Sequence, residues 1–259
     1  MSLTFRWLGA AGLELKDGEQ VLALDPFFTR PSIGRMLHPL VSNTRLVREK
    51  LPDCHFVLVT HAHYDHLMDV PIVLQYSGAV AYGSANTCQL LRFMGTPVPQ
   101  VHEVHPGDQF SLGDFSVQVI PGQHSRIPLG RLFNGQLSSH LKPPLHVQDY
   151  RMDVCLGYCI TVREKRLLVC AAEPQPAEVL FAVAQESRQY YQKLLQGTRP
   201  QLFVPIHWDN FTRPLNRPLS RFTRPGRMTL RQITCWAQKT LPEVKVIIPE
   251  VFRKYPLPE

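Results

Sequence analysis

The sequence predicts an α+β fold, a four-layer αβ/βα sandwich in which two mixed β-sheets pack together and helices cover their outer faces. Short apolar runs between turn residues open the chain as a strand meander. They then alternate with helical patterns, and this scheme repeats after a long loop. No GxGxxG follows the first apolar run, so a single doubly wound dinucleotide-binding sheet loses its main support.

The first half of the chain is expected to form one sheet and its helices. Three strands come first, separated by the turn residues GAAG and DGE. Helical and strand-like patterns then alternate, and a segment with the turns PGD and LGD, residues 101–125, reads as further strands. The expected strands cover residues 3–9, 13–18, 20–26, 55–60 and 79–83, and the expected helices cover residues 44–51, 69–78 and 84–95.

The second half is expected to form the other sheet. Residues 158–174 read as a hairpin around the polar turn REK, and residues 177–197 read as one helix. A buried strand over 200–208, a helix over 229–240 and a strand over 244–250 follow.

The segment between the two halves, residues 126–150, is a long loop with three prolines and little periodicity. Loops of this length in a compact domain are usually functional or disordered. It begins just after His124, a candidate ligand, so we expect an active-site cap. An ordinary surface excursion is the alternative.

Size and composition indicate one globular domain over residues 1–259. The 259 residues are 44% hydrophobic and 19% charged, which is typical of a folded chain with one core. No apolar run approaches the roughly 18 residues that a membrane span needs, and the N-terminus lacks the pattern of a signal peptide. We therefore expect a soluble, cytoplasmic protein without a membrane partner.

The formal net charge of +7 invites a nucleic-acid hypothesis, but it does not establish one. Basic residues concentrate only in residues 212–227, which contain five arginines among prolines. A basic surface loop and a phosphate-binding arm both remain open. Mild basicity also suits small anionic substrates.

The six cysteines show no CxxC pair and no zinc-ribbon spacing. Cys155 and Cys159 stand four apart in a strand-like run, so we expect them on one face of the sheet as buried thiols.

The chemistry concentrates in THAHYDH, residues 60–66, which follows the apolar run FVLV. Imidazole and carboxylate are ligands typical of zinc. His61 and His63 can converge on one ion, while Asp65 and His66 lie one step further and aim at a neighbouring position. The alternative is a surface turn that happens to be rich in histidine. Four ligand-type residues within six positions after a buried strand favour a metal site instead.

Two later histidines follow the same pattern, an apolar run and then a histidine where the strand ends. They are His124 in VQVIPGQHS and His207 in LFVPIHW. From the sequence pattern alone, each of these two histidines could be a metal ligand or could have no role at a metal site. Three strand ends that carry histidine at one rim would supply a metal site in a pocket.

The motif HAHYDH resembles the HxHxDH signature of the metallo-β-lactamase superfamily, and the likeness extends from Phe5 to about Val251. The resemblance implies the metallo-β-lactamase fold and two divalent metal ions, with zinc expected and manganese or iron as alternatives. The pattern is nearest to ascorbate-6-phosphate-lactonase-like and uncharacterised hydrolases. It departs from the lactonase group at Ala10, where that group often has histidine.

The family's bridging aspartate has no direct match in this chain. That aspartate follows glycine after a buried strand, whereas this chain has Ala172 and Glu173 in RLLVCAAEP. Glutamate could still bridge two ions, or it could miss them. Asp25 in LALDPFF is expected to orient a ligating histidine from behind. The resemblance implies metal ligands at His61, His63, Asp65, His66, His124, Glu173 and His207.

These residues imply a metal-dependent hydrolase that uses a metal-activated water on an ester, lactone or phosphodiester bond of a small substrate, for which an anionic compound suits the charge. Asp65 is the expected catalytic residue, as ligand and proton acceptor. Arg126, Trp208 and His146 are the expected substrate contacts.

Two other functions stay open on the same fold. The net charge suggests a nuclease or nucleic-acid phosphodiesterase, and the ligand set also suits a di-iron redox protein. The insert of β-CASP nucleases and the flavin domain of flavodiiron proteins are both absent from the sequence. We therefore expect a small-molecule substrate rather than nucleic acid.

Overall fold

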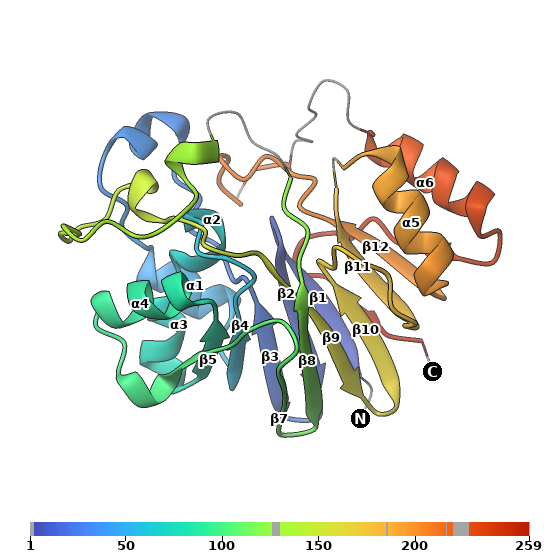
Figure 1. Cartoon of the computed structure of the whole chain (residues 1–259), viewed down its shortest axis with the longest axis horizontal. Helices are drawn as coiled ribbons and strands as arrows, with labels where there is room; N and C mark the ends of the chain where they lie inside the picture. Colours follow the sequence, from blue (N-terminus) through green and yellow to red (C-terminus); the bar gives the residue numbers. More distant parts are fainter. Residues whose placement is uncertain (1–2, 126–129, 185, 216, 220–227, 259) are drawn as a thin grey trace.

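The computed structural model describes residues 3–125, 130–184, 186–215, 217–219 and 228–258. Within these residues, two seven-stranded mixed sheets lie face to face and helices cover their outer faces (Figure 1). The predicted four-layer arrangement is therefore confirmed.

The first sheet comes from the first half of the chain and one C-terminal strand. It begins as an antiparallel meander because two tight turns, at Ala10 and at Gly18, reverse the chain. From the third strand on, neighbours run parallel, with helices as crossovers. Its order is β14 (Lys254–Pro256), β1 (Thr4–Gly9), β2 (Gly12–Asp17), β3 (Gln20–Leu24), β4 (Phe56–Leu58), β5 (Val80–Gly83) and β6 (Val101–Glu103).

The second sheet mirrors this plan. Four strands form antiparallel pairs and the rest continue as parallel neighbours. Its order is β13 (Lys245–Val246), β12 (Leu202–Ile206), β11 (Val179–Val183), β10 (Lys165–Val169), β9 (Leu156–Val162), β8 (Phe115–Pro121) and β7 (Gln109–Leu112).

Helices cover the outer face of each sheet (Figure 1). Three of them begin at a serine or threonine, Ser84, Ser187 and Thr229, whose hydroxyl accepts from a backbone N–H of the first turn. The first sheet carries α1 (Thr44–Lys50), α3 (Val70–Ser77) and α4 (Ala85–Phe93), the second carries α5 (Arg188–Thr198) and α6 (Leu230–Thr240), and α2 (Tyr64–Leu67) follows β4.

One expected helix is wrong in its first part. Residues 177–197 were predicted as a single helix, but the structure has strand β11 over Val179–Val183 and starts α5 at Arg188. All five residues of β11 are buried, between parallel neighbours β10 and β12. A short apolar run buried on both faces has no strand period, so periodicity alone could not separate it from the helix that follows.

The segment over residues 126–150 has little regular structure where it is described. It contains two short 3₁₀ helices, η3 (Gly130–Leu132) and η4 (Val147–Asp149), while residues 126–129 lie outside the described part. Two further 3₁₀ helices, η1 (Ile33–Leu37) and η2 (Val98–Gln100), occur in the first half.

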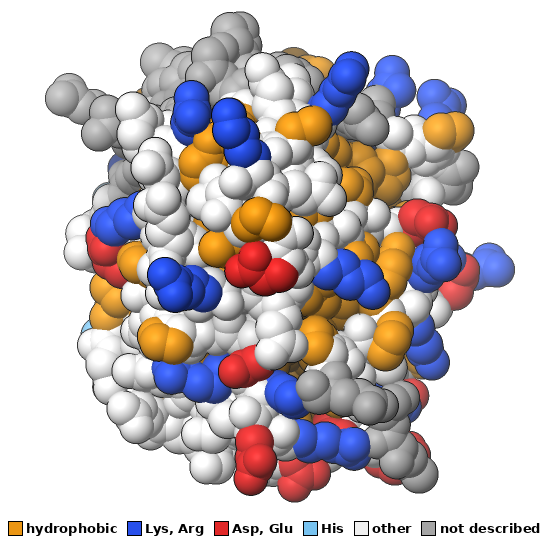
Figure 2. All heavy atoms as spheres, turned by 90° about the vertical axis from the view of Figure 1, so that its right-hand side faces the viewer, with side chains coloured by type: hydrophobic (Ala, Val, Ile, Leu, Met, Phe, Trp, Pro, Cys, Tyr) orange, Lys and Arg blue, Asp and Glu red, His pale blue; other side chains and the backbone are white. Residues whose placement is uncertain are grey.

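Apolar side chains fill the spaces between the layers. Phe5 and Phe181 meet edge to face between the two sheets, with ring centroids 5.1 Å apart. Separate clusters lie between each sheet and its helices. No helix among the described residues has the length and apolar character to cross a membrane. On the face in Figure 2, Lys and Arg lie interspersed with Asp and Glu.

Candidate metal centre

The sequence-predicted histidines lie where strands end, at one rim of the two sheets. His61 follows β4, His124 follows β8, and His207 follows β12 directly. At His207 the backbone is left-handed, with φ of 58°. Asp25 after β3 and Cys170 after β10 share this conformation, with φ of 41° and 51°. Non-glycine residues rarely adopt it, and such residues gather at functional sites.

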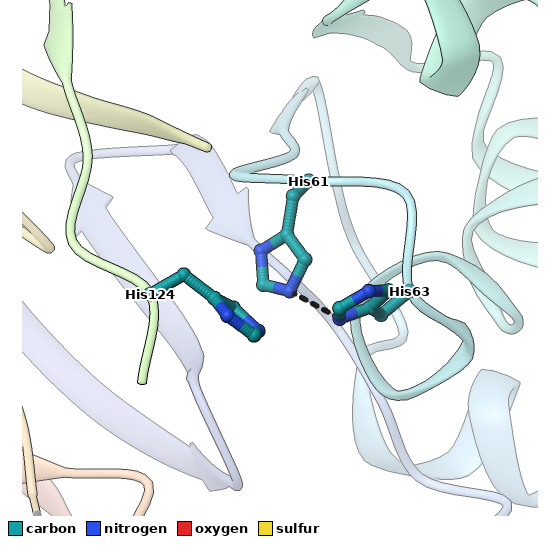
Figure 3. Close-up of side chains that lie close together, drawn as sticks. All are labelled: His61, His63 and His124. Atoms are coloured by element: carbon teal, nitrogen blue, oxygen red, sulfur yellow. Dashed lines mark hydrogen bonds between the residues drawn. The ribbon is translucent and has the colours of Figure 1, made fainter. Parts of the chain in front are cut away.

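The first candidate metal group consists of His61, His63 and His124. One ring nitrogen of each lies within 4.8 Å of the others. His61 Nε2 is 3.1 Å from His63 Nδ1, and the ring of His124 lies 4.7 Å from that of His61 and 4.9 Å from that of His63. Figure 3 shows the three rings turned toward one another, with His124 on the segment that follows β8.

The second candidate group consists of Asp65, His66 and His207, again within 4.8 Å of one another. Asp65 Oδ2 lies 3.6 Å from His66 Nε2 and 3.4 Å from His207 Nε2. The rings of His61 and His66 have centroids only 3.8 Å apart, so the two groups are adjacent. The segment after β4, which includes α2, supplies two residues to each group, as the motif predicted.

Asp25 supports this loop from beneath. Its Oδ1 accepts from the backbone N–H of Thr60 at 2.7 Å, and its Oδ2 accepts from the Thr60 hydroxyl at 2.6 Å. His66 Nδ1 lies 2.7 Å from the same Oδ2. Donation from Nδ1 leaves Nε2 of His66 free to act as a ligand, so the expected role of Asp25 is confirmed.

The other histidines of the motif are oriented in the same way. His63 Nε2 lies 3.0 Å from the carbonyl oxygen of Phe133, so it donates there and leaves Nδ1 toward His61. His61 Nδ1 lies 3.0 Å from the Thr60 hydroxyl, which leaves its Nε2 for the first group. In each ring one nitrogen is engaged and the other faces the group, which is the tautomer a metal ligand needs.

Burial keeps the first group uncharged at neutral pH. It lowers the pKa of His61 well below the usual value, and the neighbouring histidines lower it further. Burial also lowers the pKa of His63, and it lowers that of His124 to about 3. Neutral imidazoles keep a free lone pair for a cation, and three of them share this space without mutual repulsion.

Carboxylates change this balance in the second group. Burial lowers the pKa of His66, but the carboxylates of Asp25 and Asp65 together raise it by more, so the net pKa lies above its usual value. For Asp65, burial raises the pKa, yet His66 and His207 lower it by more and keep the carboxylate ionised. An ionised Asp65 is available as an oxygen ligand.

Both groups open into one cavity of about 260 Å³. Part of its wall is apolar and comes from η1, α2, the 130–150 segment and the segment after β12. Besides the six residues of the two groups, the lining residues are Met36, Thr60, Tyr64, Gln123, Ser125, Phe133, Val147, Tyr150, Cys155, Cys170, Val183, Ala184 and Phe211.

The structure corrects the expectation for Glu173. Its side chain is 63% exposed and forms an ion pair with Lys193 of α5, and it does not line the cavity. After β10 the chain continues beside the loop before His124, since Ala172 N donates to Pro121 O at 3.0 Å and carries Glu173 outward. Glu178 is not a substitute, because it accepts from the backbone N–H of Arg166 at 2.7 Å.

Two cysteines, rather than Glu173, lie next to the candidate metal groups. Cys170, the first residue after β10, is buried and lines the cavity, and Cys155 Sγ lies 4.0 Å from His61 Nδ1. Burial raises the pKa of both thiols, so they are protonated at neutral pH. Cys159 packs beneath α5, so the expectation that it shares a face with Cys155 is wrong.

The apolar-run pattern that marked His61 and His207 also marks Cys170, which directly follows RLLV. Thr60, Tyr64 and Phe211 are neighbours of predicted ligands, but nothing in the sequence indicates which of their side chains face the cavity.

Two of the three expected substrate contacts, Trp208 and His146, do not line the cavity. Trp208 stacks on Trp7, with ring centroids 4.7 Å apart, because alternation turns it away from His207 toward the interior. His146 is the N-cap residue of η4, and its backbone N–H donates to Asp149 Oδ2 at 2.7 Å. Arg126 lies outside the described residues.

A buried ion pair fixes the turn that carries His207. Arg30 Nη1 lies 2.7 Å from Asp209 Oδ2, and both side chains are fully buried. Asp209 Oδ1 accepts from the backbone N–H of Ala10 at 3.0 Å, and the Ala10 carbonyl accepts from His207 N at 2.8 Å. The first β-turn, the loop after β3 and the His207 turn are thereby joined.

Comparison with protein families gives one match that covers more than half of the chain. Residues 22–172 match the model described as beta-lactamase superfamily domain. A relative from Carboxydothermus hydrogenoformans, named a UPF0173 metal-dependent hydrolase, is 27% identical over 227 residues, 82% of this chain and 86% of its own. A UPF0173 metal-dependent hydrolase from Ruegeria sp. (strain TM1040) is 29% identical over 128 residues, 46% of this chain and 47% of that relative.

Solved structures with low sequence identity share the fold. Igni18, a metallo hydrolase from the archaeon Ignicoccus hospitalis, superposes with a TM-score of 0.64 at 16% identity and covers 98% of both chains. The diiron β-hydroxylase CmlA from Streptomyces venezuelae gives 0.54 at 16% identity, over 80% of this chain and 45% of that one. These likenesses concern the fold alone.

Proposed function

The chain belongs to the beta-lactamase superfamily, and from that premise we propose that it is a metal-dependent hydrolase with a dinuclear site. Two adjacent groups of three ligands at one cavity are the observation that carries the proposal. The names of the relatives, metal-dependent hydrolases, support the same reaction class.

The residues fit two divalent ions. His61, His63 and His124 would hold one, and Asp65, His66 and His207 would hold the other. Three protein ligands with an open fourth position are typical of catalytic zinc, and imidazole with one carboxylate suits zinc better than calcium or magnesium. We therefore propose zinc at both groups.

When bound, the ions would supply an activated water and a Lewis acid for the scissile bond. The protein's own groups orient the candidate ligands for this chemistry. Asp25 and the Phe133 carbonyl fix the rings of His66 and His63, so little reorientation is needed when substrate enters. Asp65, ionised and beside both His66 and His207, is the proposed acceptor of the proton that the attacking water loses.

Metal analysis and a substrate panel test this proposal. The purified chain is expected to hold about two zinc ions and to hydrolyse at least one of a carboxylic ester, a lactone and a phosphodiester, with activity lost on chelation and restored by zinc. His61→Ala and Asp65→Asn should each cost more than the roughly 100-fold that follows loss of an outer partner of a metal site.

His105→Ala is the matched control, since His105 is 68% exposed on a turn away from both groups. It should leave metal content and activity unchanged. A chain that binds no metal, or a His61→Ala variant with full activity, would contradict the proposal.

A further inference from the structure

The cavity wall opposite the candidate ligands is apolar. We call it the apolar wall and define it by six residues: Met36, Tyr64, Phe133, Val147, Tyr150 and Phe211. No Lys or Arg occurs among the lining residues that the structure describes. The wall therefore offers dispersion contacts and exclusion of water rather than a charge.

The apolar wall reaches both candidate metal groups. The ring of Phe211 meets that of His207 edge to face at 5.2 Å, and it lies 6.4 Å from the ring of Tyr64. The carbonyl oxygen of Phe133 accepts a hydrogen bond from His63 Nε2 at 3.0 Å. A molecule that reacts between the two groups would therefore place its neighbouring atoms against these side chains.

Four hydroxyl groups of the cavity lining are already engaged. The Tyr64 hydroxyl donates to the sulfur of Met36 at 3.8 Å, and the Tyr150 hydroxyl donates to the sulfur of Met94 at 3.6 Å. The Thr60 hydroxyl donates to Asp25, and the Ser125 hydroxyl donates to Glu186. A polar or charged substituent placed here would lose its hydration without a strong new partner, which is costly.

From this wall, and resting on the proposed hydrolase function, we propose that the substrate is an uncharged carboxylic ester or lactone with an apolar acyl group. The two ions would meet charge at the scissile bond, but no Lys or Arg among the described lining residues would meet a further fixed charge on the acyl group. The cavity of about 260 Å³ has room for a small acyl group beside the two candidate metal groups.

Hydrolysis of matched esters tests the charge. The 4-nitrophenyl esters of butyric and succinic acid have acyl chains of equal length, and only the second carries a carboxylate. We expect kcat/KM for the butyrate to exceed that for the hemisuccinate by at least tenfold. A hemisuccinate preference that disappears in Arg126→Ala would overturn the proposal in favour of an anionic substrate.

Binding to the metal-free chain tests the apolar wall without hydrolysis. In an NMR titration with propionamide, butyramide, pentanamide and hexanamide, Kd should fall about fourfold for each added methylene, which corresponds to ~0.8 kcal/mol per buried CH₂. A Kd independent of chain length would overturn the proposal. Chain-length-dependent binding without hydrolysis of any ester, lactone or phosphodiester would support the apolar site and overturn the hydrolase proposal.

Variants assign the effect to the wall. Phe211→Ala should reduce the chain-length gain in both measurements, whereas Phe93→Ala, on the outer helix α4, should keep it. Val147→Thr, which preserves shape and adds a hydroxyl, is the second variant should Phe211→Ala fail to fold. An unchanged chain-length gain in folded Phe211→Ala and Val147→Thr would overturn the assignment.

Discussion

At the scale of single residues, the site depends on a few side chains that lie just beyond strand ends. Asp25, Cys170 and His207 each have a left-handed backbone directly after a strand. The chain turns sharply there, and Cys170 and His207 line the cavity while Asp25 supports the ligand loop. A strand that continued its pleat would send alternate residues to opposite faces instead.

Glu173 gives a prediction at this scale. Glu173→Gln should leave zinc content and activity within twofold of the parent, because its exposed carboxylate pairs with Lys193 rather than with a candidate ligand. Asp65→Asn is the contrasting variant and should lose one of the two ions. Zinc content by atomic emission measures both. A Glu173→Gln protein that holds a single ion would restore the bridging role that the sequence suggested.

Asp25 gives a second prediction. Asp25→Asn keeps the shape but replaces one accepting oxygen by an NH₂ group. That group would face either the Thr60 backbone N–H, now bonded to Oδ1, or both the Thr60 hydroxyl and His66 Nδ1, now bonded to Oδ2. Zinc affinity of the second group should fall about 10- to 100-fold, as is usual for outer partners of metal ligands. Competition with a chromogenic chelator measures it. Asp114→Asn, at an exposed turn, is the control, and equal affinities in the two variants would contradict the role of Asp25.

The candidate ligands could be predicted because motif and strand-end position occur together in the sequence. Five histidines and Asp65 lie in the two groups as inferred. Glu173 was misplaced because its position after β10 depends on how the chain pairs with Pro121, a contact between distant segments. The apolar wall was missed for the same reason, since its residues come from four segments that only tertiary packing brings together.

At the scale of elements, the loop after β3 acts as a brace between the two ligand-bearing parts. Asp25 at its start holds Thr60 and His66, and Arg30 at its end holds Asp209. Asp69, before α3, accepts from the backbone of Phe28 and Thr29 at 2.7 and 2.8 Å. The loop is therefore attached at its beginning, middle and end.

The Arg30–Asp209 pair gives the prediction for this brace. Arg30→Met leaves Asp209 as a buried carboxylate without its cation, which should lower the free energy of unfolding by about 3–5 kcal/mol. Arg253→Met removes an ion pair whose partners are 60% and 70% exposed, so it should cost less than about 1 kcal/mol. Chemical denaturation measures both, and equal costs would show that burial of the pair is unimportant.

Element boundaries were predictable where turn residues or caps mark them. The meander of β1, β2 and β3 and the starts of α4 and α6 fall within a residue or two of expectation. Strand β11 was assigned to a helix because its five apolar residues carry no period. Strand β14 was missed because Lys254–Pro256 is short and gains its structure only by pairing with β1.

At the scale of the whole molecule, the site lies across the junction of the two sheets. The loop after β4 and the helix α2 that follows it supply four candidate ligands from the first sheet, and the second sheet supplies His124 and His207. The protein also joins the sheets directly here, since Leu156 N donates to Thr60 O at 2.7 Å and the Tyr158 hydroxyl donates to Val59 O at 2.7 Å.

Metal removal gives the prediction at this scale. Ions that bind only the folded chain stabilise it, by about 2.7 kcal/mol for one site at 100 times Kd. Because these ions would join both sheets, chelation should lower the Tm of the whole chain in one transition rather than loosen one half. Differential scanning calorimetry measures this. A His61→Ala, His207→Ala double variant should show a smaller shift on chelation, and an unaltered Tm in the parent would contradict the bridging position of the ions.

Through the hydrogen bond from His63 to Phe133, the 130–150 segment would take part in holding a metal ion at the first group. Segment closure and metal binding then share one contact, so each must favour the other by the same free energy. Bound zinc should slow hydrogen exchange in residues 130–150, and withdrawal of that segment should speed zinc release. Opening of the cavity at this segment and metal binding at the first group would therefore be thermodynamically linked through the ring of His63.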